Sequence, residues 1–171
     1  MDDNYELDEL LTKPKRKNSR TKGNAFERQI AKALNNRFKT TEFSRSPGSG
    51  AFATTHSLPE HLKIYGDLIT PDKFKYCIEC KKGYNHLNLY SLYNYSSEFW
   101  KFIEQCEKDS QKCNKIPLLI FKQDRQPALA VLPGEIETPE PINHINIHKN
   151  KTYKVYLFNE LLKCWDSLWF D

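Results

Sequence analysis

The stretch YGDLITPDKFKYCIECKK, residues 65–82, decides the fold. It predicts two strands, GDLIT and KYCIECKK, joined by a turn around Pro71. Because side chains alternate along a strand, Glu79 and Lys81 leave the same face, and Asp67 on the neighbouring strand can approach them. An ordinary hairpin with a charged outer face has the same pattern, so the stretch alone leaves a structural and a chemical interpretation open.

The rest of the chain predicts a mixed sheet flanked by helices. Apolar residues recur every four positions from Phe26 to Phe38, which indicates an amphipathic helix with Thr21 or Asn24 as its N-cap. The order of elements places the two acids and the lysine in the middle of the sheet. The other expected elements are a short strand before the turn at 47–50, a helix in 96–115, strands at 116–121, 127–132, 142–148 and 152–158, and a short helix from Asn159.

Length and composition fit one folded domain with small additions, since the chain has 171 residues and a hydrophobic content of 39%. No apolar run approaches the roughly 20 residues of a membrane span. The N-terminus is acidic where a secretory signal would be basic. We therefore expect a cytoplasmic protein with no membrane partner.

Basic residues are concentrated near the N-terminus, although the net charge of +4 is modest. Residues 1–10 hold five of the 22 acidic residues and no basic one, whereas residues 13–22 hold six basic residues. Such a run is typical of a solvated tail, but a flexible basic arm also gains affinity for nucleic acid by releasing phosphate counterions. The stretch 81–95, rich in tyrosine and asparagine, leaves a similar choice between backbone binding and packing at the sheet edge.

The two acids and the lysine have the chemistry of a phosphodiester hydrolase. Two carboxylates held close together raise each other's pKa, whereas a divalent cation supplies the missing charge and keeps both ionised. Magnesium prefers such a site, with few hard oxygen ligands and several retained waters. A metal-bound water is a nucleophile at neutral pH, and Lys81 can orient it or stabilise charge that develops on phosphate.

The sequence resembles the PD-(D/E)XK nucleases and, within them, the archaeal-type Holliday-junction resolvases. The segment KGNAFERQIAKAL resembles the family's first helix with its Glu-Arg pair, and FSRSPGSG resembles the strand and turn that follow. The core motif corresponds to Asp67, Glu79 and Lys81, and a helix and a hydrophobic strand pair follow in order. The resemblance spans about residues 22–132 and implies a restriction-endonuclease-like mixed β-sheet flanked by helices.

The resemblance also implies roles for single residues. Asp67 and Glu79 would bind Mg²⁺ or Mn²⁺ together with the main-chain carbonyl of Cys80. Glu27 would join them from the first helix, directly or through water, and Lys81 would be the catalytic lysine. The residues that would contact DNA or support the site are Arg28, Arg45, Ser46, Ser49 and Lys82, with Lys15, Arg16, Lys17, Arg20 and Lys22 from the basic segment.

Three regions are expected: a flexible acidic-then-basic arm at 1–21, a nuclease core at 22–132, and a C-terminal extension at 133–171, a small β-hairpin plus helix packed on the core. One departure from the resolvases is the insertion at 51–65, which carries His56 and His61 where the resolvases pass almost directly from the Gly/Ser turn to the Asp. The C-terminal extension is another.

The function implied is a metal-dependent, structure-selective endonuclease that resolves four-way DNA junctions. A junction is recognised by its shape and backbone, so the enzyme needs basic surface, and a homodimer lets it cut two opposed strands. The alternatives are another PD-(D/E)XK DNA nuclease, such as a repair or flap nuclease, an exonuclease or a restriction enzyme, and a non-catalytic DNA-binding protein of the same fold.

Overall fold

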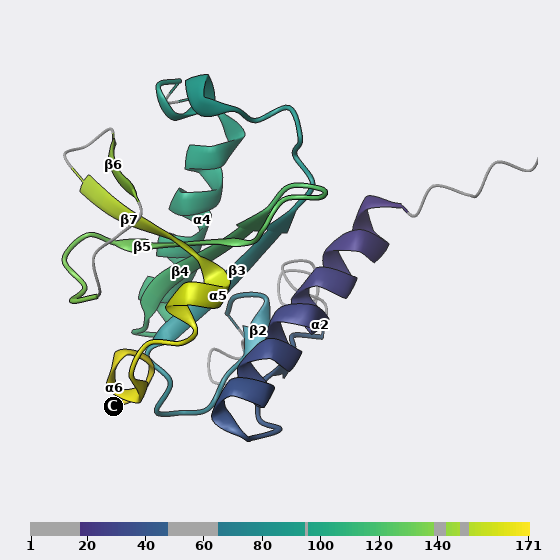
Figure 1. Ribbon diagram of the computed structural model, residues 1–171, viewed down its shortest axis with the longest axis vertical. Helices are drawn as coiled ribbons and strands as arrows, with labels where there is room; N and C mark the ends of the chain where they lie inside the picture. Colours follow the sequence, from purple (N-terminus) through teal and green to yellow (C-terminus); the bar gives the residue numbers. More distant parts are fainter. Residues whose placement is uncertain (1–17, 48–64, 95, 139–142, 148–150) are drawn as a thin grey trace, which may run out of the picture.

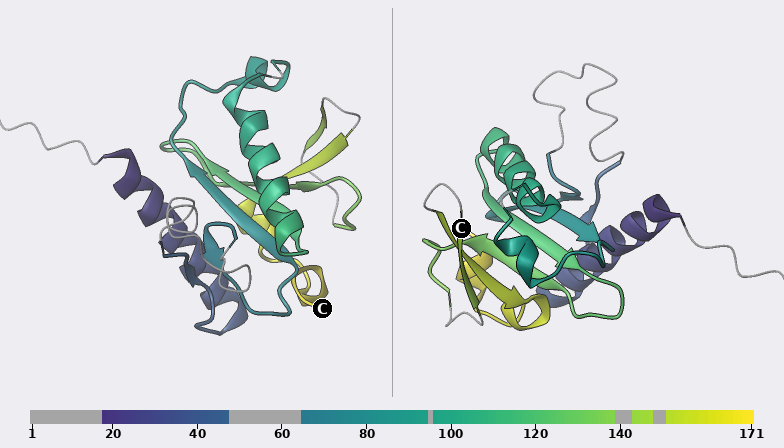
Figure 2. Two further views of the ribbon diagram at one scale, coloured as in Figure 1. Left: turned by 180° about the vertical axis from the view of Figure 1, so that it is seen from behind. Right: turned by 90° about the horizontal axis from the view of Figure 1, so that it is seen from above.

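The computed structural model describes residues 18–47, 65–94, 96–138, 143–147 and 151–171, with the backbone alone for 143–147. Within these ranges a five-stranded mixed sheet has the strand order β3-β4-β5-β7-β6. Helix α4 covers one face of this sheet, and α2, α5 and α6 cover the other (Figures 1 and 2). The strands are β3 (Tyr76–Lys82), β4 (Ile116–Lys122), β5 (Leu129–Pro133), β6 (Asn143–Ile147) and β7 (Lys151–Leu157).

The pairing of β3 differs from the expected hairpin. Strand β2 (Leu68–Ile69) pairs with β1 (Ser44–Arg45) in a separate antiparallel ladder, whereas β3 pairs in parallel with β4. The intervening helix α4 provides the crossover that a parallel pair requires. Strand β3 is therefore the edge strand of the five-stranded sheet, and the expectation that the acids lie in its middle was wrong.

Helix α2 spans Ser19–Phe38 and begins earlier than the apolar pattern indicated. The side chain of Asn18, not of Thr21 or Asn24, is the cap, and it accepts a hydrogen bond of 2.8 Å from the Thr21 N–H. Most of the expected N-terminal arm lies outside the described residues, and its last three residues belong to this helix. The buried face of α2, with Phe26, packs on the sheet as predicted.

Helix α4 spans Glu98–Lys112 and follows a short 3-10 helix, η2 (Leu89–Leu92). Ser97 takes the expected N-cap position, but its hydroxyl donates to the Ser91 carbonyl at 2.8 Å instead of capping α4. The predicted apolar stripe is buried against the sheet, with Phe102 among its residues.

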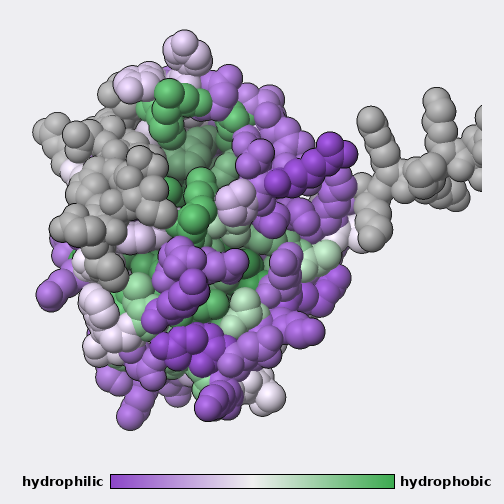
Figure 3. Space-filling view, viewed as in Figure 1, coloured by the Kyte–Doolittle hydropathy of each residue, from purple (hydrophilic) through white to green (hydrophobic). Residues whose placement is uncertain are grey.

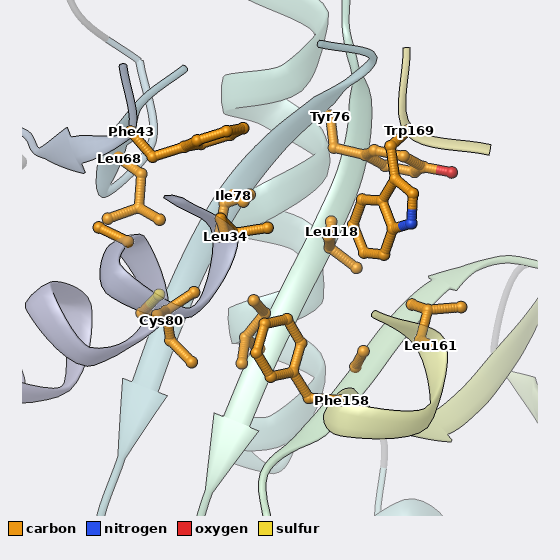
Figure 4. Close-up of a cluster of buried hydrophobic side chains, with 14 of the residues drawn as sticks. Leu34, Phe43, Leu68, Tyr76, Ile78, Cys80, Leu118, Phe158, Leu161 and Trp169 are labelled. Carbon is orange, nitrogen blue, oxygen red and sulfur yellow. The ribbon is translucent and has the colours of Figure 1, made fainter. Parts of the chain in front are cut away.

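Side-chain alternation divides the core into two layers. Along β3 and β4, Ile78 and Ile120 point toward α2 and the C-terminal helices, whereas Leu119 and Phe121 point toward α4. Figure 4 shows the first layer, where side chains from α2, β3, β4 and the C-terminal segment meet. A buried sheet held from both faces leaves the side chains of β3 little freedom.

The C-terminal segment adds strands to the same sheet, since β7 pairs with β5 and β6 pairs with β7. The single helix expected after Asn159 is two short ones, α5 (Phe158–Leu161) and α6 (Asp166–Trp169). The Arg37 guanidinium binds the carbonyls of Leu162 and Cys164, each at 2.9 Å, which a continuous helix would use internally. None of the helices in the described ranges is long and apolar enough to cross a membrane.

Candidate active site

Asp67 is fixed against β3 by two hydrogen bonds. Its N–H donates to the Ile78 carbonyl at 2.8 Å, and its Oδ2 accepts from the Cys80 N–H at 2.8 Å. The preceding Gly66 has a positive φ of 76°, and a Cβ there would lie 2.7 Å from the Ile78 carbonyl oxygen. Only glycine fits this approach, so the Gly-Asp pair sets the carboxylate beside the edge of β3.

Ser46 holds the same loop from the other side. Its N–H donates to the Asp67 carbonyl at 2.9 Å, and its hydroxyl donates to the Gly66 carbonyl at 3.1 Å. The residue is buried. Its main-chain and side-chain donors therefore position the Asp67 loop.

The Cys80 carbonyl faces the same open edge. Within a strand, the N–H and C=O of one residue lie on the same side. Because the Cys80 N–H turns toward Asp67, the carbonyl also turns away from β4. The backbone thus adds a hard oxygen beside the two carboxylates of Asp67 and Glu79.

The side chains of Glu79 and Lys81 leave the same face of β3, as predicted, opposite to the face that carries Ile78 and Cys80. They form an ion pair in which Lys81 Nζ lies 2.5 Å from Glu79 Oε1. The Lys81 Nζ also donates to Gln105 Oε1 at 3.1 Å and lies 5.3 Å from the centre of the Phe102 ring. The sequence did not indicate that Gln105 contacts Lys81, or that Phe102, expected in the core, also lies beneath the Lys81 ammonium. Their spacing of three residues on α4 is the one signal that relates them.

Glu27 points toward the site from α2 and is paired with Arg45 of β1. The Arg45 Nε lies 2.6 Å from Glu27 Oε2, and its Nη2 donates to Asn24 Oδ1 at 3.1 Å. Glu27 is buried. Arg45, expected to contact phosphate or to support the site, contacts two side chains of α2 here.

The pKa values of the two buried glutamates, Glu27 and Glu79, are perturbed by burial and by the charge of Asp67. Burial and the nearby charge of Asp67 raise the pKa of Glu79 to about 7, despite the opposing effect of Lys81. Burial and the Asp67 charge also raise the pKa of Glu27, against the hydrogen bond and charge of Arg45. Burial lowers the pKa of Lys81, but the charge and hydrogen bond of Glu79 outweigh it and raise that pKa. The site thus has a deficit of positive charge.

The donor set fits a hard divalent cation. Carboxylate oxygens of Asp67 and Glu79 and the Cys80 carbonyl are ligands of the kind that Mg²⁺ and Mn²⁺ take, and a cation would offset the repulsion that raises the pKa of Glu79. Over the ranges that the structure describes, no three His, Cys, Asp or Glu residues are grouped as a ready metal cluster. Glu79 and Glu27 are held instead by Lys81 and Arg45.

The remaining candidates for DNA contact lie around the start of α2 and the end of β3. Arg20, Lys22 and Arg28 are exposed on α2, and Lys82 is half-buried with its Nζ 5.8 Å from the Phe26 ring centre. Figure 3 shows hydrophilic residues over this part of the molecule, at the right of the view. The candidates outside the described residues are Ser49, Lys15, Arg16 and Lys17, and His56 and His61 of the insertion.

A mixed sheet flanked by helices, with an Asp beside an edge strand that carries Glu-x-Lys, defines a restriction-endonuclease-like fold, and the expected fold class is confirmed. The family model described as "phage putative PDDEXK endonuclease" matches residues 18–168, so the chain belongs to this family of PD-(D/E)XK nucleases. Protein D14 of Escherichia phage T5 is 38% identical over 113 residues. That match covers 63% of this chain and 66% of Protein D14, just under two thirds. No solved structure matches significantly.

Proposed function

We propose that the protein is a divalent-metal-dependent endonuclease that cuts branched DNA and acts as a junction resolvase. The observation that carries this proposal is the meeting of Asp67, Glu79 and Lys81 at the edge of β3, with Glu27 close enough for Asp67 to raise its pKa. Membership of a PD-(D/E)XK endonuclease family supports hydrolysis of a phosphodiester.

In this proposal Asp67, Glu79 and the Cys80 carbonyl hold Mg²⁺ or Mn²⁺, and Glu27 contributes directly or through water. The ion, when bound, lowers the pKa of a coordinated water and polarises the phosphate. Lys81 orients that water or stabilises charge on the phosphate oxygens. Gln105 and Phe102 position the Lys81 ammonium, and Arg45 positions Glu27.

Recognition of a branched substrate rests on backbone contacts and on two copies of the chain. In support, Arg20 and Lys22 are exposed on α2, the helix that also carries Glu27, and Lys82 follows Lys81 on β3, so these cations could neutralise phosphates without reading bases. A homodimer would bring two sites to opposed strands of one junction.

The test is cleavage of a synthetic immobile four-way junction, a flap and a plain duplex by the purified full chain in Mg²⁺. Symmetric nicks confined to the junction are the expected result. Equal cutting of duplex, or cutting confined to flaps or ends, would assign the site to another kind of PD-(D/E)XK nuclease. Binding of DNA without any cleavage in Mg²⁺ or Mn²⁺ would identify a non-catalytic DNA-binding protein.

A further inference from the structure

The segment between β3 and α4 presents two exposed tyrosines on a rigid turn. Tyr90 is 81% exposed and Tyr93 is 77% exposed, and both belong to or adjoin η2. Tyr84 in the same segment differs, since its ring packs against Phe102 with centroids 4.6 Å apart, and Tyr95 lies outside the described residues. Of the two alternatives left open by the sequence, packing holds for Tyr84, whereas Tyr90 and Tyr93 lie on the surface.

The turn that carries these two rings is held firmly in place. The Asn88 side chain accepts from the Tyr90 N–H at 3.0 Å, and Ser91 Oγ accepts from the Asn88 N–H at 3.1 Å, which completes a capping box. The Trp100 indole donates to the Leu92 carbonyl at 3.1 Å and fixes the turn to α4. A rigid mounting lowers the entropy that exposed rings would lose on binding a partner.

This turn is joined to the helix that also contacts the candidate active site. Trp100, which anchors it, is only two residues before Phe102, which lies under the Lys81 ammonium. In Figure 3 hydrophobic residues reach the surface at the top of the view, over η2 and the start of α4.

A group of basic residues borders the same segment. Gln123, at the end of β4, donates to the carbonyls of Tyr84 and Leu87 at 3.1 and 2.7 Å and joins the β4–β5 loop to this segment. The next residue, Asp124, accepts from Asn85 at 3.0 Å and lies 3.8 Å from the Lys22 ammonium. The hydrogen bond from Asn85 and the charges of Lys22, Lys82 and Arg125 lower the pKa of Asp124, so these three cations lie around it.

The segment thus has basic side chains bordering its start and exposed rings near its end, and cations together with exposed rings are the combination that binds single-stranded nucleic acid. The cations follow the phosphates, and each ring stacks on a base, with no need for a particular sequence. Base pairs in a duplex are stacked on one another and offer no face to a tyrosine. The rings therefore favour DNA in which some bases are unpaired, as at a branch point, a gap or a flap.

We propose that Tyr90 and Tyr93 form a stacking platform for unpaired DNA bases, with Lys22, Lys82 and Arg125 holding the adjoining backbone. This inference rests on the proposed nuclease function and refines its substrate to DNA that carries a single-stranded portion.

The test compares binding of a labelled single-stranded oligonucleotide and of the duplex of the same sequence, by fluorescence anisotropy in EDTA. We expect the double variant Tyr90→Ala/Tyr93→Ala to weaken single-strand binding by about 10-fold or more, and to leave duplex binding within about 2-fold. The matched variant Tyr90→Phe/Tyr93→Phe keeps both rings and is expected to bind as the unaltered protein does. Trp165→Ala removes an exposed ring at the other end of the molecule and serves as the second control.

Unchanged single-strand binding in the alanine variant, or an equal loss for single strand and duplex, would overturn the platform. So would sedimentation of the unaltered protein as a dimer and of the alanine variant as a monomer, since the rings would then belong to a protein interface. If the unaltered protein nicks the four-way junction in Mg²⁺ while the alanine variant still binds single strands normally, the inference fails and the proposed function stands. If the unaltered protein neither binds nor cuts any DNA, both fail.

Discussion

Strand β3 begins at Tyr76 in an aromatic cluster and ends at Lys82 beside a group of buried charges. At the first end, the Tyr76 ring packs edge-on against Trp169 and its hydroxyl donates to the Leu168 carbonyl at 3.0 Å. Toward the second, Glu79 is buried near Asp67, and burial together with the Asp67 charge raises the pKa of Glu79. The ring contacts at the first end stabilise the fold, whereas the repulsion between the acids at the second opposes folding.

This difference separates residues that hold the fold from residues that are kept for chemistry. Burying charges of like sign together costs stability, and perturbed pKa values cluster at functional sites. Substitutions at the two ends of β3 should therefore have opposite profiles: lost stability at the aromatic end, and lost activity without lost stability at the acidic end.

The largest expected effect is on cleavage by Asp67→Asn. The substitution keeps an oxygen for the Cys80 N–H but removes a proposed metal ligand, so the rate in Mg²⁺ should fall by about 10³-fold or more. Without metal at pH 8, the free energy of unfolding should be unchanged or higher, because the repulsion of Glu79 is gone. Single-turnover cleavage and urea unfolding measure the two quantities.

Asp72→Asn is the matched control for that substitution. Asp72 lies in the same stretch and is exposed, so both its cleavage rate and its stability should equal those of the unaltered protein. A large loss of stability in Asp67→Asn, with activity of the folded fraction retained, would make Asp67 a structural residue.

The next largest effect is on stability at the aromatic end. Trp169 is fully buried and contacts Phe38, Phe74 and Tyr76. Trp169→Ala should lower the free energy of unfolding by about 3–5 kcal/mol, from lost burial and the cavity left behind. Trp169→Phe should lower the free energy of unfolding by less. In both variants, single-turnover cleavage by the fraction that remains folded should be near normal. A selective loss of cleavage would contradict the division between the two ends.

The pH dependence of stability should reveal the acidic end. Without metal, the folded-state pKa of Glu79 is about 7, above the usual value of 4.5. A raised carboxyl pKa means that the folded state binds its proton more tightly. Its penalty is therefore absent below about pH 4.5, grows between pH 4.5 and 7, and is constant above, at roughly 3 kcal/mol.

Urea unfolding of the unaltered protein and of Glu79→Gln across this range isolates the Glu79 contribution. The unaltered protein should lose stability relative to the variant as pH rises to 7, and a saturating divalent cation should reduce that loss. If the stability of the two proteins changed with pH in parallel without metal, the pKa of Glu79 would not be raised. If a saturating cation left the pH-dependent loss of the unaltered protein unchanged, Glu79 would not be a metal ligand.

The smallest expected effect is on the position of Lys81. Gln105→Ala removes an acceptor of the ammonium but leaves the Glu79 ion pair and the Phe102 contact. Loss of one partly exposed hydrogen bond of this kind is worth about 1 kcal/mol, so kcat should fall roughly 5-fold with KM little changed. Gln111 is an exposed glutamine further along α4, and the control substitution Gln111→Ala should leave kcat and KM unchanged. A change in KM alone would place Gln105 in substrate binding.

Local sequence patterns predicted much of this architecture. The four-residue repeat from Phe26 predicted α2, and alternation along 76–82 correctly placed Glu79 and Lys81 on one face of β3. The pairing of β2 with β1 was missed, because adjacent strands with a short connection favour a hairpin, and the parallel partner β4 lies beyond a whole helix. Register between distant strands is set by packing that no local window contains.

The candidate site was predictable in its motif and not in its supporting contacts. Asp67, Glu79 and Lys81 have a recognisable spacing in the sequence. Nothing in the sequence distinguishes Gln105 from the other glutamines, and in the structure it is exposed. The Arg45–Glu27 pair joins a strand to a helix and depends on the turn after α2. The split between α5 and α6 likewise depends on Arg37, more than a hundred residues earlier.

The most direct test of the central claim is the rate at which Glu79→Gln cleaves labelled branched DNA as Mg²⁺ is titrated from EDTA to saturation. The unaltered protein should be inactive in EDTA and should gain activity with a saturable dependence on the ion. Glu79→Gln should stay inactive throughout while circular dichroism shows the same fold. Cleavage by Glu79→Gln at the unaltered rate, or cleavage by either protein in EDTA, would contradict a metal site built on β3.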